Sequence, residues 1–227
     1  MFRCSFLAAV GLLISASALA AQTPNVAPAL AATESTPPQE TMEDPQVGDH
    51  WTYEVRDDIT GDLKSTFTTT ITDVSTTDIS IRDTIVGNSN FGYASYDRSW
   101  NRISNDTWRF TPNDGMGIRS QLAVGKTWSV KASDLLSTKG LTWKRSVTSK
   151  VVAKESVTTR AGTFDTYKIE ASVELQNTND PTKKFLDVRQ TWYAPAIDHW
   201  VKLSSVMRSD GRVRSKTSTE LVEYGRR

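Results

Sequence analysis

The stretch FDTYKIEASVELQ, residues 164–176, decides the fold class of this chain. Apolar side chains stand at every second position, and charged or small polar side chains fill the positions between them. Because successive side chains of a β-strand point to opposite faces, this period of two predicts a strand with one apolar and one solvated face. Antiparallel sheets bury strands in this one-sided way. The apolar set is Tyr167, Ile169, Ala171, Val173 and Leu175, and the polar set is Lys168, Glu170, Ser172 and Glu174.

Further strand candidates lie on both sides of this stretch and are separated by turn signals. The turn Arg160-Ala161-Gly162-Thr163 joins it to a long candidate, residues 141–159, and Asp210-Gly211 is a strong two-residue hairpin signal. With residues 184–193, 200–208 and 212–224, these segments predict a five-strand meander. The residues expected on the buried face of segments 184–193 and 200–208 are Leu186, Val188, Trp192, Val201, Leu203 and Met207.

Residues 46–225 as a whole are predicted to form one all-β domain. The N-terminal half repeats the strand and turn texture more weakly, and only residues 132–138 could form a short helix. We expect about ten antiparallel strands, strongly curled into a half-barrel or an open barrel, because large twisted sheets tend to curl. A two-sheet sandwich is the alternative.

The N-terminus has the pattern of a secretory signal peptide. Arg3 provides a positive charge, residues 6–19 form an apolar run, and Ala18-Leu19-Ala20 is a small-x-small cleavage signal. We therefore predict a signal peptide over residues 1–21 and a periplasmic or secreted mature protein. Residues 22–45 are small, polar and proline-containing, which predicts a disordered tether. The apolar run is too short for a membrane span, so no integral span is expected after processing.

Charge and cysteine content exclude several classes of function. The chain carries 27 basic and 26 acidic side chains, a formal net charge of +1, so nucleic acid is not expected as a partner. The single cysteine, Cys4, precedes the apolar run of the predicted signal peptide, which excludes it as the lipidated first residue of a mature lipoprotein. A mature chain without thiols also has no disulfide, no Cys-ligated metal and no Cys nucleophile.

An aromatic-rich stretch is the main candidate for a binding site. Residues 87–105 are rich in Gly, Asn, Ser and aromatic residues, and we interpret them as a long loop. Their rings either plug one end of a core that is poor in leucine, or form the rim of a site for an apolar or carbohydrate ligand. The candidate ligand-binding residues are Phe91, Tyr93, Tyr96, Trp100 and Trp108.

No catalytic site is predicted. The Gly-x-Ser-x-Gly, His-Glu-x-x-His, Gly-x-x-x-x-Gly-Lys-Ser/Thr and Gly-x-Gly-x-x-Gly motifs are absent from the sequence. The two histidines, His50 and His199, each stand between Asp and Trp at a predicted strand start. They are weak metal candidates, because a site would need both rings to converge with a carboxylate. We therefore expect no cofactor, no metal and no enzymatic activity.

Three short segments, taken in order, resemble a known group of proteins. They are Val124-Gly125-Lys126-Thr127-Trp128, Ala161-Gly162-Thr163-Phe164 and Trp192-Tyr193-Ala194-Pro195. The set resembles exported bacterial proteins of the TapB-like or domain-of-unknown-function type, over roughly residues 47–224. The resemblance implies a curved antiparallel β domain and supplies no catalytic residues. Members commonly have a glycine in the turn after the third segment, where this chain has Ala196-Ile197-Asp198.

A curled sheet with one apolar face encloses a concave apolar surface. The leading functional prediction is therefore a non-enzymatic binding or carrier role in the periplasm, for an apolar small molecule. The alternative is a structural or assembly role at the cell envelope, in which a sheet edge or the final hairpin contacts an envelope protein. A hydrolase has the least support. The basic residues of that final hairpin are Arg208, Arg212, Arg214 and Lys216.

Overall fold

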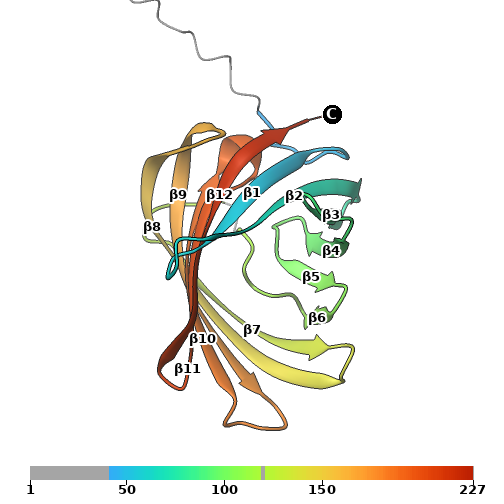
Figure 1. Ribbon diagram of the computed structural model, residues 1–227, viewed down its shortest axis with the longest axis vertical. Helices are drawn as coiled ribbons and strands as arrows, with labels where there is room; N and C mark the ends of the chain where they lie inside the picture. The colour runs from blue at the N-terminus through green and yellow to red at the C-terminus, as the bar shows by residue number, and fades with distance from the viewer. Residues whose placement is uncertain (1–40, 119–120, 227) are drawn as a thin grey trace, which may run out of the picture. The chain divides into compact units, whose positions relative to one another are not determined.

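Each strand of the sheet pairs with its neighbour in the chain, and the last strand returns to pair with the first (Figure 1). The computed structural model describes residues 41–118 and 121–226, and the sheet that they form is a closed antiparallel barrel. Strands β1 and β12 close it, paired from His50 opposite Gly225 to Asp57 opposite Thr217, with one register shift between Thr52 and Tyr53. The elements are β1 (His50–Asp57), β2 (Leu63–Val74), β3 (Asp78–Ile85), β4 (Phe91–Asp97), β5 (Arg102–Asn105), β6 (Trp108–Thr111), β7 (Thr127–Leu136), β8 (Leu141–Thr159), β9 (Gly162–Asn177), β10 (Lys184–Ala194), the 3₁₀ helix η1 (Pro195–Ile197), β11 (His199–Ser209) and β12 (Arg212–Gly225).

The all-β prediction is confirmed, but its details are wrong. The described residues form twelve strands in one closed sheet, rather than about ten strands in a half-barrel, an open barrel or a two-sheet sandwich. The predicted loop 87–105 contains β4 and β5, and most of the candidate helix 132–138 belongs to β7. The short strands were missed because β5 and β6 have only four residues each and lie beside the Gly, Asn and Ser residues that are typical of turns.

The two ends of the barrel are built differently. At one end of the barrel, here called the hairpin end, short turns join each odd-numbered strand to the even-numbered strand that follows it. The turns after β9 and β11 lie at the bottom of Figure 1, and the turn after β7 lies at its lower right. The opposite end, here called the capped end, holds η1, the β6–β7 connection and the last residues of β12. Antiparallel strands of alternating direction require this division.

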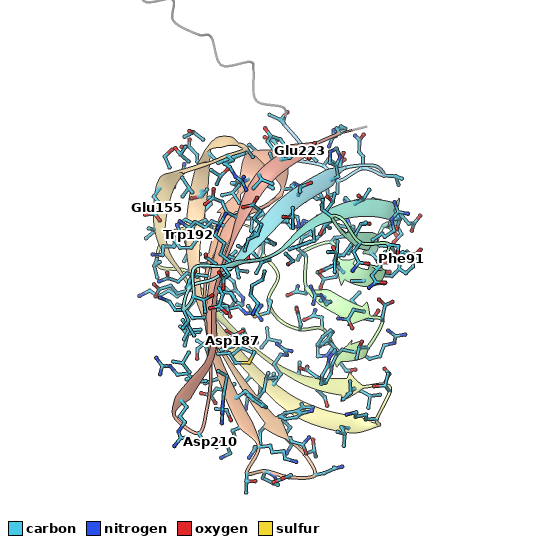
Figure 2. All side chains as sticks on the ribbon, in the orientation of Figure 1. Phe91, Glu155, Asp187, Trp192, Asp210 and Glu223 are labelled. Atoms are coloured by element: carbon cyan, nitrogen blue, oxygen red, sulfur yellow. The ribbon has the colours of Figure 1, made fainter. Side chains whose placement is uncertain are left out.

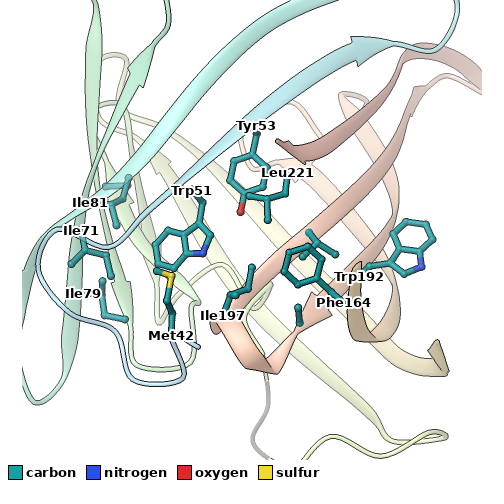
Figure 3. Packing of buried hydrophobic residues seen from close by; sticks show 13 residues of the cluster. Met42, Trp51, Tyr53, Ile71, Ile79, Ile81, Phe164, Trp192, Ile197 and Leu221 are labelled. Carbon is teal, nitrogen blue, oxygen red and sulfur yellow. The ribbon is translucent and has the colours of Figure 1, made fainter. Parts of the chain in front are cut away.

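A cluster of buried apolar side chains fills the capped end (Figure 3). Met42, from the segment before β1, lies beside the Trp51 ring, and its backbone N–H donates a hydrogen bond to the Ala196 carbonyl at 2.7 Å. Large rings carry much of this core, because each aromatic side chain buries about 150–250 Å². The fully buried members are Met42, Trp51, Tyr53, Ile71, Ile79, Ile81, Ala194, Ile197, Val201 and Leu221.

The β8–β9 hairpin has long strands, of 19 and 16 residues. Strand β8 reaches past its neighbours to contact β11 and β12. The indole N–H of Trp192 donates to Glu155 Oε1 at 2.5 Å (Figure 2). At the turn, Arg160 forms an ion pair with Glu54 of β1 and lowers the pKa of that carboxyl. The hairpin therefore joins β8 to strands on the far side of β9.

The predicted signal peptide, residues 1–21, lies outside the described residues, as do residues 22–40 of the predicted tether. Residues 41–45 of the predicted tether are described, and Met42 among them is fully buried. No helix in residues 41–118 or 121–226 is long and apolar enough to cross a membrane.

Candidate functional site

Two adjoining cavities lie along the inner wall of the barrel. The first, here called the inner cavity, has a volume of about 250 Å³ and lies beside the apolar core. The second, here called the outer cavity, has a volume of about 400 Å³ and lies toward the hairpin end. Arg102 of β5 and Arg189 of β10 line both cavities, so the two arginines mark the boundary between them.

The wall of the outer cavity is mainly aromatic and aliphatic. Trp108, Trp143 and Phe185 are the first, third and second residues of β6, β8 and β10, which all begin at the hairpin end. Phe110, Val173 and Met207 add further apolar surface. The apolar filling of the capped end therefore does not continue to the hairpin end, and a cavity remains there instead.

Ion pairs built from inward-facing charges interrupt this apolar wall. Arg145 Nε contacts both carboxylate oxygens of Asp134, at 3.0 and 2.9 Å, and its Nη2 contacts Oδ2 at 2.5 Å. Asp187 accepts hydrogen bonds from Arg189 Nε and from Ser205 Oγ, both at 2.6 Å. Both carboxylates are almost fully buried, and a buried carboxylate requires such partners.

Arg102 stands apart from these ion pairs. Its Nε and Nη2 donate to the Tyr96 hydroxyl at 3.0 and 2.7 Å, which is a contact with a neutral partner. The nearby Asp114 accepts the backbone N–H groups of Arg102 and Met116, and Asp83 accepts the Thr69 hydroxyl at 2.5 Å. Burial raises the pKa of both carboxyl groups.

His199 belongs to an aromatic cluster on the inner cavity. Its ring stacks on Trp51 with centroids 4.4 Å apart, and its Nδ1 lies 2.7 Å from the Tyr53 hydroxyl. The same hydroxyl donates a hydrogen bond to the Trp200 carbonyl at 2.9 Å. Complete burial lowers the pKa of His199 to about 3. The imidazole is therefore neutral near pH 7.

Asp198 ties the η1 turn to the β4–β5 turn. It adopts a left-handed backbone conformation, with φ at 44°, a region that favours glycine. Its carboxylate accepts the Tyr193 hydroxyl at 2.6 Å and the Trp100 indole N–H at 2.9 Å. Burial raises the pKa of this carboxyl group. These two hydrogen bonds hold the Trp100 ring against the inner cavity.

The five aromatic residues predicted as a ligand site do not form one site. Tyr96 and Trp100 line the inner cavity, and Trp108 lines the outer cavity. Phe91 and Tyr93 lie on the solvated face of β4, where they are 59% and 52% exposed. Because the stretch was interpreted as a loop, the alternation of a strand was not applied to it, and inward and outward rings were not separated.

The two histidines predicted as weak metal candidates have separate partners. His50 Nδ1 lies 3.3 Å from the Gly48 carbonyl, and its Nε2 lies 3.9 Å from Glu223. His199 is enclosed by Trp51, Tyr53 and Trp100. Across residues 41–118 and 121–226, no group of three or more His, Cys, Asp or Glu side chains comes together in a way that could hold a metal ion.

The charged residues of the cavity wall were missed because the inward face of β10 was assigned wrongly. The sequence was interpreted with Leu186, Val188 and Trp192 on the buried face. Trp192 is buried in the core cluster, where its indole donates to Glu155 of β8, but Val188 is 43% exposed. The odd-numbered residues of β10 face inward instead, and the signal that identifies this face is the aromatic residue at each end of the set. Its members are Phe185, Asp187, Arg189, Thr191 and Tyr193.

Residues 139–210, from the turn before β8 to the turn after β11, are similar to a family described as DUF3108-like. Two solved structures share the fold over the whole of their own length. One is a candidate lipoprotein from Parabacteroides distasonis, with 13% identity, 82% of this chain covered and a TM-score of 0.51. The other is a candidate exported protein with a YmcC-like fold from Bacteroides fragilis, with 13% identity, 83% of this chain covered and a TM-score of 0.53. A comparison with curated proteins gives no match.

These findings agree with the broader part of the resemblance seen in the sequence, a domain of unknown function with exported relatives. The TapB-like part of that resemblance stays a prediction. At 13% identity the two structures establish similarity of fold alone.

Proposed function

We propose that this protein is a non-enzymatic carrier that binds a small, largely apolar molecule inside its barrel, in the bacterial periplasm. The observation that carries the proposal is the outer cavity, about 400 Å³ in volume and walled by Trp108, Trp143, Phe185 and Met207. Small-molecule sites are typically concave and mainly apolar, with a few polar groups that fix orientation. The outer cavity fits that description.

The arrangement of the inner cavity supports binding over catalysis. The His199 imidazole has a pKa of about 3, so it is a poor general base near neutral pH. Tyr53 and Asp198 are held in hydrogen bonds that join one part of the fold to another. These groups fix the shape of the wall.

The place of action is supported by the N-terminal sequence and by the names of the two similar structures. Residues 1–21 have the pattern of a signal peptide. The two structures are named as an exported protein and a lipoprotein candidate. Closure pairs each described strand with two neighbours, but residues 153–159 of β8 pair with β9 alone, so the alternative role in envelope assembly keeps a short stretch of free sheet edge.

The proposal is tested with the processed protein purified from a bacterial periplasm. Denaturing extraction and mass spectrometry should find a small apolar molecule in stoichiometric amount. The stripped protein should then bind the apolar dye 1-N-phenylnaphthylamine, with a change in its fluorescence.

A steric block provides the matched control. Met207→Trp places a larger ring in the outer cavity and should weaken dye binding at least tenfold. Leu135→Trp makes a comparable change at a side chain that is 40% exposed, and should leave dye binding unchanged. Equal dye affinity in both variants, or a clean extract from a protein that binds no dye, would contradict the proposal.

A further inference from the structure

We propose that the molecule bound in the barrel is an anionic amphipath, whose acidic group lies between Arg102 and Arg189 and whose apolar chain lies in the outer cavity. This inference rests on the proposed carrier function and adds the chemical class of its ligand. The observation behind it is that two arginines stand where the two cavities meet, with donors that the described residues do not use.

Arg102 is the first of these cations. It is largely buried, and its described hydrogen bonds through the side chain go to the Tyr96 hydroxyl alone. No carboxylate oxygen of residues 41–118 or 121–226 lies within 4.0 Å of its guanidinium nitrogens, whereas Arg145 has such a partner in Asp134. A guanidinium has five N–H donors, and a buried cation needs negative charge beside it. Desolvation would lower the pKa of Arg102, but Tyr96, Asp114 and Asp83 outweigh desolvation and raise that pKa. The two carboxylates act from beyond ion-pair distance. An acidic ligand group would pair with the guanidinium directly.

Arg189 is the second cation. Its Nε donates to Asp187 at 2.6 Å, and its two terminal nitrogens make no hydrogen bond to another described residue. Asp187, which is labelled in Figure 2, lines the outer cavity and also accepts the Ser205 hydroxyl. The Arg189 side chain is 32% exposed, which leaves the outer part of the fork open to the cavity. Guanidinium forks bind carboxylate and phosphate groups through two parallel N–H donors.

The carboxylates that line the two cavities do not remove the preference of the arginines for an anionic ligand. Asp134 and Asp187 are already paired with Arg145 and Arg189. Asp83 and Asp114 accept hydrogen bonds from Thr69 and from backbone N–H groups, and neither touches the Arg102 side chain. Burial raises the pKa of both, which reduces the negative charge opposing an anion.

The apolar chain is placed by the wall between the arginines and the hairpin end. Arg189 and Phe185 both line the outer cavity and lie four residues apart on β10, about 13 Å along the strand at ~3.3 Å per residue. Trp143 and Trp108 complete the wall at the hairpin end of that path. A ligand with its acidic group at the arginines would therefore lay its chain against aromatic surface.

The test measures binding of four probes that share a dodecyl chain, below their micelle concentrations, by quenching of tryptophan fluorescence. The probes are dodecanoate, dodecyl phosphate, dodecanol and dodecylammonium. Charge-assisted hydrogen bonds predict that both anions bind about tenfold to a hundredfold more tightly than the alcohol, and that the ammonium binds least. The ratio between the two anions distinguishes a carboxylate ligand from a phosphate ligand.

Variants of Arg102 localise the effect. Arg102→Gln should reduce the affinity for dodecanoate about tenfold or more and leave dodecanol unchanged, and Arg102→Lys should recover part of the loss. Arg212→Gln removes an exposed arginine on the outside of the barrel and should change neither. Circular dichroism and the Tm of each variant check its folding, and the four probes on the unaltered protein decide the question if Arg102→Gln does not fold.

The outcomes separate this inference from the carrier proposal. Dodecanol or dodecylammonium binding as tightly as dodecanoate would overturn the anionic ligand and leave the carrier standing. An anion preference that Arg102→Gln leaves intact in a folded protein would overturn the assigned position. No binding of any probe, together with no binding of 1-N-phenylnaphthylamine, would overturn the carrier function itself.

Discussion

Lowering the pH from 7 to 5 should destabilise this protein by about 2 kcal/mol through His199 alone. The ring is buried, stacked on Trp51 and hydrogen-bonded to the Tyr53 hydroxyl, and no carboxylate of residues 41–118 or 121–226 forms an ion pair with it. The neighbouring Asp198 directs its oxygens to Tyr193 and Trp100 instead. The folded protein therefore holds His199 neutral where the unfolded chain would accept a proton.

The sign and size follow from the two pKa values of this histidine. Burial lowers the folded-state pKa to about 3, while the unfolded chain has a value near 6.5. Between these values the unfolded state binds more protons, so the stability is fully present above pH 6.5 and is lost as the pH falls toward 3. At pH 5 the difference amounts to about 2 kcal/mol, because each unit below 6.5 contributes about 1.4 kcal/mol.

Urea unfolding at pH 7, 6 and 5 measures this effect, provided that the protein is compared with His199→Gln. Asp83, Asp114 and Asp198 have raised pKa values and act in the opposite direction, and subtracting the variant removes their contribution. The stability advantage of the unaltered protein over His199→Gln should shrink by about 2 kcal/mol between pH 7 and pH 5. His50→Gln, which removes the other histidine, should keep the pH dependence of the unaltered protein. A constant difference across this range would show that His199 binds protons equally in the folded and unfolded states, and would refute the reasoning.

Two further tests concern the ion pair in the barrel wall and the packing of the β6–β7 connection. Arg145→Met leaves the buried Asp134 carboxylate unpaired and should lower the free energy of unfolding, measured with urea, by about 3–5 kcal/mol. Adding Asp134→Leu should restore most of this loss. A double variant as unstable as the single one would contradict the prediction. Gly117→Ala would drive a Cβ into the Ser99 carbonyl oxygen and should cost about 3 kcal/mol, against about 1 kcal/mol for Gly140→Ala, where strain from a positive φ is the only penalty. Equal losses in Tm for the two alanine variants would contradict the crowding at Gly117.

The strand identity of residues 164–176 could be predicted from sequence because alternation is a local property. That stretch lies within β9, and the inward-facing Val173 is buried while Glu174 is exposed. Closure of the barrel could not be predicted in this way. It depends on pairing β1 with β12, where Trp51 meets Tyr224, and no local pattern reports a contact between the two ends of a domain.

The candidate site shows the same division between local and non-local information. Aromatic rings were visible as candidates, but their faces were not, since Phe91 and Tyr96 differ only in which side of β4 they occupy. Arg102 and Arg189 were missed because they form a candidate site only together. They belong to strands on different sides of the barrel, and only the folded sheet brings them to the same cavity. In the sequence each is one arginine among many basic residues.

The ion pairs in the cavity wall are not explained by a contribution to the stability of the fold. A buried ion pair is often no more stabilising than apolar residues of the same volume, because desolvation offsets the attraction between the charges. The capped end shows that this chain can fill a barrel end with Trp51, Ile81 and Leu221. At the hairpin end, the pair of Asp134 with Arg145 instead stands in a wall that encloses free volume. The paired charges of the wall lie near Arg102, which has no ion pair among the described residues. Together they give the cavity a polarity that an apolar filling would remove. That polarity is the property a carrier needs in order to orient an amphipathic ligand.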